Sequence, residues 1–286
     1  MKPQFVTAIY TGLEGTRYNG NTAAIYDRYK LSLRSLADGG YSIVCYTASA
    51  HLEDLTNWFE NHPNVKLVVE ELSENYFHQQ IEAIKDRKAK YTTEDAWRSR
   101  CVEIMWGKFY WLWKNTTELE AGDSLYWIDA GIFHGGLITN KFRSPESKSF
   151  YDFDLINQKR NLFEDLNKHA GDKVLNILSQ TVNHGSDDYV QVYPDRPEYA
   201  VIGGIFGGKR DVLLDYIGKA TTHMQLVIDH DVLLKEEEIM YYLHQREPEL
   251  YTNFKFNSWY HDDWPIDLYD PNVHVAFSDF FKVIRA

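Results

Sequence analysis

The sequence lacks the features of a membrane or secreted protein. No stretch approaches the about 18 consecutive apolar residues that a membrane-spanning helix needs. The first residues, MKPQFVTAIY, hold no basic region followed by a long apolar segment and a cleavage site, so we expect no signal peptide and a cytoplasmic location. The only two cysteines, Cys45 and Cys101, stand in apolar segments. They favour free thiols in a reducing compartment over a disulfide framework.

Positive charge is also scarce. The chain has 42 acidic and 30 basic residues, a formal net charge of −12, which argues against nucleic acid as a partner. It has no internal repeat, and no G-x-G-x-x-G motif follows its first strand-like run, which argues against a dehydrogenase. Aromatic residues are plentiful at 15%; they suit stacking on sugars, and equally they suit a large core.

The hydrophobic pattern predicts strands that alternate with helices. In the first half, strands are expected at Phe5–Tyr10, Ser42–Thr47, Val65–Val69 and 124–132, with helices near 22–37, 51–61, 74–88 and 94–115. In the second half, we expect helical structure around 155–180, strands at Tyr189–Tyr193 and Tyr199–Ile202, and helices near 210–221 and 235–247. Such alternation indicates a Rossmann-like α/β fold, a mostly parallel sheet with helices on both faces. Ligands then bind beyond the carboxyl ends of the strands.

No linker divides the chain. We therefore expect a single catalytic domain over residues 1–286, with a nucleotide-binding half at 1–136 and an acceptor and catalytic half at 137–286. The sheet argument places the base and phosphate end of a nucleotide at the exit of the first strand, at Tyr10, Thr11, Gly12 and Arg17.

The motif Trp127–Gly131 (WIDAG) is an apolar strand that ends in one carboxylate, Asp129. A strand-terminal Asp can ligate a divalent metal or reach a ribose hydroxyl, and its small neighbours Ala130 and Gly131 let a nucleotide approach the backbone. An Asp that only caps the next turn looks the same in sequence.

Two further motifs follow in the second half. The stretch Gly203–Lys209 (GGIFGGK) predicts a loop that wraps a sugar or a phosphate, with Gly204, Phe206 and Gly207 as contacts. The segment Lys235–Leu243 (KEEEIMYYL) predicts a helix with three carboxylates in its first turn. The helix dipole alone would favour acids there, and a catalytic carboxylate would look the same.

The order of these motifs resembles the bacterial HtrL/YibB-type proteins, a glycosyltransferase group associated with surface-polysaccharide synthesis. The residues that carry the resemblance are YTG, KFYWLWKN, WIDAG, GGIFGG and EEEIMYYL, between residue 5 and about residue 255. The last two elements are also similar to the blood-group-type α1,3-glycosyltransferases, in which a glycine loop precedes a helix with an essential Glu. The resemblance implies a GT-A fold and aligns Glu236 with that Glu. Glu237 is one residue away, and Glu238 is expected on the solvated face of the helix.

The chain departs from the GT-A pattern at one position. Enzymes of this fold usually carry Asp-x-Asp at the strand end, and here Gly131 replaces the second acid. The resemblance implies a metal, Mn²⁺ or Mg²⁺, held by Asp129 and His261. Alternatively, His261 is only a solvated residue beside Asp262 and Asp263, and cations such as Arg17, Lys108 or Lys209 stabilise the leaving diphosphate.

The predicted function is transfer of a hexosyl or pentosyl group from a nucleoside-diphosphate sugar to a hydroxyl of a glycan or glycolipid. A glycoside hydrolase is less well supported, because no opposed pair of carboxylates can be identified. The other alternative is a non-catalytic carbohydrate-binding or assembly protein with a degenerate GT-A fold, which the missing second acid favours.

Overall fold

The computed structural model describes residues 2–11, 22–86, 101–130, 164, 167, 168, 170–180, 199–229, 236–256 and 284–285. The described strands are β1 Gln4–Ile9, β2 Ser42–Thr47, β3 Val65–Val69, β4 Ser124–Ile128, β5 Val174–Gln180, β6 Tyr199–Lys209, β7 Tyr251–Phe256 and β8 Ile284–Arg285. The described α-helices are α1 Thr22–Asp38, α2 Leu52–Trp58, α3 His78–Asp86, α5 Cys101–Thr116, α9 Arg210–Asp229 and α10 Glu236–Arg246. Within these residues, no helix is both long and apolar enough to cross a membrane.

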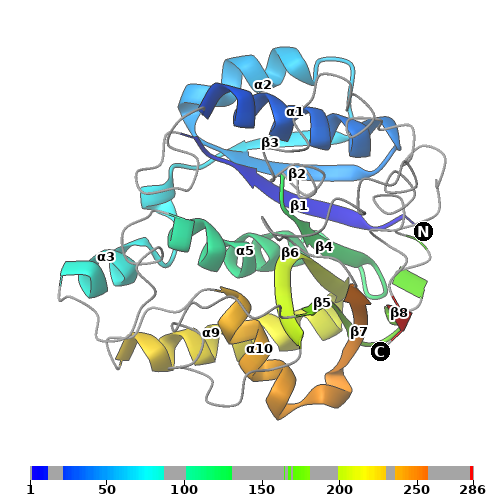
Figure 1. Ribbon diagram of the computed structural model, residues 1–286. Coiled ribbons are helices and arrows are strands. Elements are labelled where there is room, and N and C mark those ends of the chain that lie inside the picture. The colour runs from blue at the N-terminus through cyan, green and yellow to red at the C-terminus, as the bar shows by residue number, and fades with distance from the viewer. Residues whose placement is uncertain are drawn as a thin grey trace, which may run out of the picture.

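The strands form one sheet in the order β3-β2-β1-β4-β6-β5-β7-β8 (Figure 1). The first four neighbours, β3, β2, β1 and β4, are all parallel to one another, so their carboxyl ends lie on one edge. Strand β6 runs antiparallel to both β4 and β5, while β5 and β7 are again parallel. The predicted α/β fold with a mostly parallel sheet is confirmed.

Helices cover both faces of the sheet. Because side chains alternate along a strand, Leu125 and Trp127 of β4 join a buried cluster with α5, α9 and α10. Tyr126 and Ile128 join a second cluster on the other face, where α1 and α2 pack (Figure 1). Cys45 of β2 belongs to this second cluster as a buried free thiol, and burial raises its pKa to about 12.

The glycine-rich stretch is a strand and not the predicted loop. Residues 203–209 continue β6, in which Gly207 pairs with Tyr126 of β4 and with Leu175 of β5. A Cβ on Gly207 would lie 2.3 Å from the backbone oxygen of Leu125, and the φ of Gly207 is 158°. Glycine at this position lets strands β4 and β6 approach closely. Gly207→Val is therefore expected to impair folding, whether or not Gly207 contacts a ligand.

The second half differs from the prediction in other elements as well. The helical pattern predicted for 155–180 is wrong at its end, because Val174–Gln180 is strand β5. Gly171 ends the helical turn before it: its φ is 60°, and its N–H donates to the oxygen of Asn167. Strand β7, next to β5, was not predicted at all. The strand predicted at Tyr189–Tyr193 lies outside the described residues.

Candidate active site

Asp129 follows the last residue of β4, on the edge where β1, β2 and β3 also end. Its backbone N–H donates to the oxygen of Gly204 in β6 at 2.8 Å, which fixes the backbone at this point. Its Oδ1 accepts a hydrogen bond from the indole of Trp127 at 2.7 Å. The side chain remains 43% exposed. Asp129 is thus an oriented carboxylate that solvent or a ligand can reach.

Lys108 lies under Asp129 and comes from the buried side of α5. Its ammonium is 3.0 Å from Asp129 Oδ1, 2.6 Å from Glu236 Oε1 and 2.9 Å from the backbone oxygen of Gly203. Three contacts use all three protons of an ammonium. Burial disfavours the charged form, but the two carboxylates outweigh it, and the pKa of Lys108 is raised above its ordinary value. Lys108 is therefore a buried cation that holds two acids together.

The two acids at the start of α10 differ in exposure and in partners. Glu236 is 3% exposed, and its Oε2 has no hydrogen-bond partner among the described residues. A Cβ on Gly203 would lie 2.4 Å from Glu236 Oε1, so only glycine fits there. Glu237 is half-buried and accepts the backbone N–H of Gly203 at 3.0 Å. Glu236 is locked into the ion cluster, and Glu237 is the more accessible of the two.

Glu238 does not lie on the solvated face of the helix, contrary to the prediction. It is 2% exposed. Helix α10 contacts α9 and α5 as well as β6, so more than one of its faces is covered.

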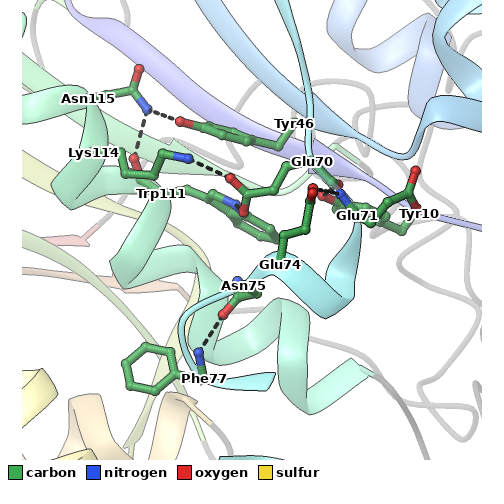
Figure 2. Close-up of polar contacts among 10 residues, drawn as sticks. All are labelled: Tyr10, Tyr46, Glu70, Glu71, Glu74, Asn75, Phe77, Trp111, Lys114 and Asn115. Carbon is green, nitrogen blue, oxygen red and sulfur yellow. Dashed lines mark hydrogen bonds and ion pairs between the residues drawn. The ribbon is translucent and has the colours of Figure 1, made fainter. Parts of the chain in front are cut away.

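A second polar cluster holds α5 against the end of β3 (Figure 2). Glu70, the residue after β3, is 6% exposed. Its carboxylate accepts the indole N–H of Trp111 at 2.7 Å and pairs with Lys114 at 2.5 Å. The Tyr10 hydroxyl donates to the backbone oxygen of Glu70 at 2.7 Å. These contacts fix the helix that carries Lys108.

Tyr10, which was predicted to contact the nucleotide, belongs to the core. It is 8% exposed and stacks on Trp111, with ring centroids 5.8 Å apart. Thr11, the next residue, is half-buried, and its hydroxyl lies 2.9 Å from Nε2 of His51. Burial lowers the pKa of His51, although nearby acids oppose this, so the ring favours its neutral form. At the exit of β1, the Thr11 and His51 side chains are both partly exposed.

Nearby, Glu71 lies on the same edge after β3. Its Oε1 accepts the backbone N–H of Ser49 at 2.8 Å and the hydroxyl of Ser49 at 2.6 Å. The pKa of Glu71 is lowered by these hydrogen bonds, so the exposed carboxylate is ionised. Sequence reasoning missed both Glu70 and Glu71. The signal was present, because each follows an apolar strand as Asp129 does.

The other predicted ligand contacts are buried, pair elsewhere or lie outside the described residues. Phe206 is fully buried between Phe109 and Tyr216, as a core residue. Lys209 pairs with Asp172 at 2.6 Å and stands opposite Ser124, at the far end of β4, so it cannot act beside Asp129. Ala130 is 4% exposed and packs in the core. Gly12, Arg17, Gly131, His261, Asp262 and Asp263 lie outside the described residues.

Asp129 can offer a divalent metal only one of its two carboxylate oxygens. Among the residues that the structure describes, the two donors to Asp129, Trp127 and Lys108, both contact Oδ1, which leaves Oδ2 for a cation. Mn²⁺ or Mg²⁺ needs further ligands, and the predicted one, His261, is not among the described residues. Metal binding at Asp129 stays a prediction.

Comparison with known proteins gives likeness of fold alone. No family model matches the chain, and no curated protein matches it. The HtrL/YibB resemblance therefore stays a prediction. Solved structures with similar folds include mouse xyloside xylosyltransferase 1 in its apo form, at TM-score 0.43 and 11% identity, covering 99% of this chain and 95% of that one.

Two other solved structures are similar to about the same degree. One is mannose-6-phosphate isomerase from Helicobacter pylori, at TM-score 0.40 and 10% identity, covering 81% of this chain and 78% of that one. The other is 4-diphosphocytidyl-2C-methyl-D-erythritol synthase from Anaerococcus prevotii DSM 20548, at TM-score 0.39 and 10% identity, covering 98% and 96%. Likenesses of this size do not bear on the activity of the chain.

Proposed function

We propose that the chain is a GT-A glycosyltransferase that moves a hexosyl or pentosyl group from a nucleoside diphosphate to a hydroxyl of a glycan or glycolipid, in surface-polysaccharide synthesis. The observation that carries the proposal is the meeting of Asp129, Glu236 and Glu237 around Gly203 and Lys108. These residues come from four separate segments, and they meet at the edge of the sheet where ligands bind in such folds. The donor is placed against residues 1–136 and the acceptor against 137–286.

The roles of the residues follow from their exposure. Asp129 Oδ2 is directed to the donor, as acceptor for a ribose hydroxyl or as ligand of a cation. Glu237 is the reactive carboxylate. Glu236 and Lys108 are positioning residues, because both are almost fully buried. Thr11 and His51 lie at the base end of the donor.

In the proposed reaction, the bond between the anomeric carbon and the diphosphate oxygen breaks, and its electron pair leaves with the nucleoside diphosphate. The acceptor hydroxyl oxygen forms the new bond to that carbon. Glu237 accepts the hydroxyl proton as general base. The ion cluster of Lys108 carries one positive and two negative charges, so it supplies no net positive charge to the leaving group.

Binding of nucleotides tests the proposal directly. A ligand of the native state raises the melting temperature, so UDP, GDP and CMP are each added to the full chain, with and without Mn²⁺. At least one is expected to raise the melting temperature, and the matching nucleotide sugars should then release nucleotide in the presence of acceptor glycans. If no nucleotide shifts the melting temperature and no donor is turned over, the proposal is wrong.

Replacing the two acids of α10 one at a time tests which of them is the reactive carboxylate and which only positions other groups. Glu237→Gln is expected to keep nucleotide affinity and to lower turnover by at least about a hundredfold, the range for a lost general base. Glu236→Gln should lower turnover less, since its amide oxygen can still accept from Lys108. Both are measured by nucleotide release and nucleotide titration.

The matched control for these two variants is Glu249→Gln, the same change at an exposed acid of the 3₁₀-helix Pro248–Leu250. It is expected to behave as the unmodified chain. Near-normal turnover in both α10 variants would show that these acids only cap the helix. The reactive group would then have to be sought at Asp262 and Asp263.

A non-catalytic carbohydrate-binding protein is the second candidate function. It is favoured by Lys108, which occupies one oxygen of Asp129, together with Gly131 in place of the second acid. A chain that binds a nucleotide or a glycan, yet releases no nucleotide from any donor, would support this candidate.

A further inference from the structure

We propose that His78, Glu82 and Glu103 form a binding site for a divalent transition metal, with Zn²⁺ as the preferred ion, that ties α3 to α5. This site is separate from Asp129 and does not depend on the proposed function. One ligand atom from each of the three side chains lies within 4.8 Å of the other two.

Two helices supply the ligands in a suitable geometry. His78 and Glu82 are four residues apart in α3, which puts them on one face of the helix. Glu103 comes from the first turn of α5. Bonds from zinc to nitrogen and oxygen are about 2.0–2.2 Å long, so small side-chain movements would bring the three atoms around one ion.

The two helices are held together independently of any ion. Phe77, just before α3, packs edge-on against Trp106 of α5, with centroids 5.5 Å apart. Ile81 is fully buried in the same cluster. Because the backbone positions are set by this core, the three ligands are presented as a preformed group.

Burial and charge favour a cation here. The Glu103 side chain is fully buried, and Oε1 makes a very short contact with Nδ1 of His78. The group holds two carboxylates and one imidazole, which are ligand types that divalent metal ions take in proteins. Glu82 and Glu103 also take part in other interactions. A metal would need one oxygen from each and would leave the second for those partners.

The donor set decides the kind of metal. Imidazole with carboxylates suits Zn²⁺ and neighbouring transition ions, whereas Mg²⁺ and Ca²⁺ prefer oxygen ligands alone. Three protein ligands also leave a fourth position to water. The competing explanation is a proton shared between His78 and Glu103 with no metal at all, and this explanation predicts no response to zinc.

The test uses the full chain after treatment with EDTA and dialysis. Titration with ZnCl₂ is followed by calorimetry, and the melting temperature is recorded with ZnCl₂ and with MgCl₂. We expect about one equivalent of Zn²⁺ to bind, with a rise in melting temperature that MgCl₂ does not reproduce. Changes to residues that only hydrogen-bond to a metal ligand already weaken metal binding by roughly 10–100-fold, so His78→Ala should weaken it by at least about a hundredfold.

Glu82→Gln is the second variant, because Glu82 is half-buried and its replacement leaves the core intact. It too should weaken zinc binding and remove the rise in melting temperature. His62→Ala is the matched control: His62 also faces an acid, with Nε2 2.7 Å from Asp38, but lies outside the cluster. Its zinc binding should be unchanged. Absence of binding in the unmodified chain, or equal losses in His62→Ala and His78→Ala, would overturn the proposal.

Discussion

Asp129→Asn is expected to reduce turnover by at least about a thousandfold, the upper range for loss of one electrostatic contact in an active site. The amide oxygen of Asn can still accept from Trp127 and Lys108, so the fold should remain. What is lost is the negative charge on the oxygen directed to the donor. Turnover is measured as nucleotide release, and folding by circular dichroism and melting temperature.

The control for this variant lies at the other end of the same strand. Asp123 precedes β4, is also partly exposed, and accepts the backbone N–H of Glu120 at 3.0 Å. Asp123→Asn is therefore the same chemical change at the opposite edge of the sheet, and it should leave turnover unchanged. If Asp129→Asn is as active as Asp123→Asn, Asp129 has no part in the reaction.

Local patterns predicted the elements that are fixed by local contacts. Strands β2 and β3 have the predicted bounds, since each is a short apolar run between turn signals. The glycine stretch in β6 was misread because the neighbours that require its glycines lie on another strand and on a helix. The backbone of β4 approaches Gly207, and the carboxylate of Glu236 approaches Gly203. Neither neighbour is close to its glycine in the sequence.

The candidate site was predictable residue by residue, but not as an arrangement. Asp129 was visible as an acid after an apolar strand, and Glu236 as an acid at a helix start. Lys108 was predicted to stabilise the leaving diphosphate, whereas its ammonium already contacts three protein groups. That it bridges two acids could not be read from the sequence, since 128 residues separate Lys108 from Glu236. A long-range ion cluster has no local pattern.

The importance of that ion cluster can be measured by removing its cation. Lys108→Met is expected to lower the free energy of unfolding by about 3–5 kcal/mol, the usual cost of removing one partner from a buried ion pair. The methionine fills most of the space of the lysine stem, so the loss reports charge more than volume. Glu236, 3% exposed, would then be a buried carboxylate without its cation. Urea unfolding followed by circular dichroism measures the change.

Two further variants test whether the loss of stability comes from the buried charge. Lys66→Met removes a lysine from a pair with Glu118 in which both side chains are more than half exposed, and it should cost less than about 1 kcal/mol. The double variant Lys108→Met with Glu236→Gln should recover part of the stability, because it replaces the unpaired charge by a neutral amide. If Lys108→Met costs no more than Lys66→Met, Lys108 does not hold the two acids together. Asp129 would then have to be oriented by Trp127 and by its backbone bond to Gly204 alone.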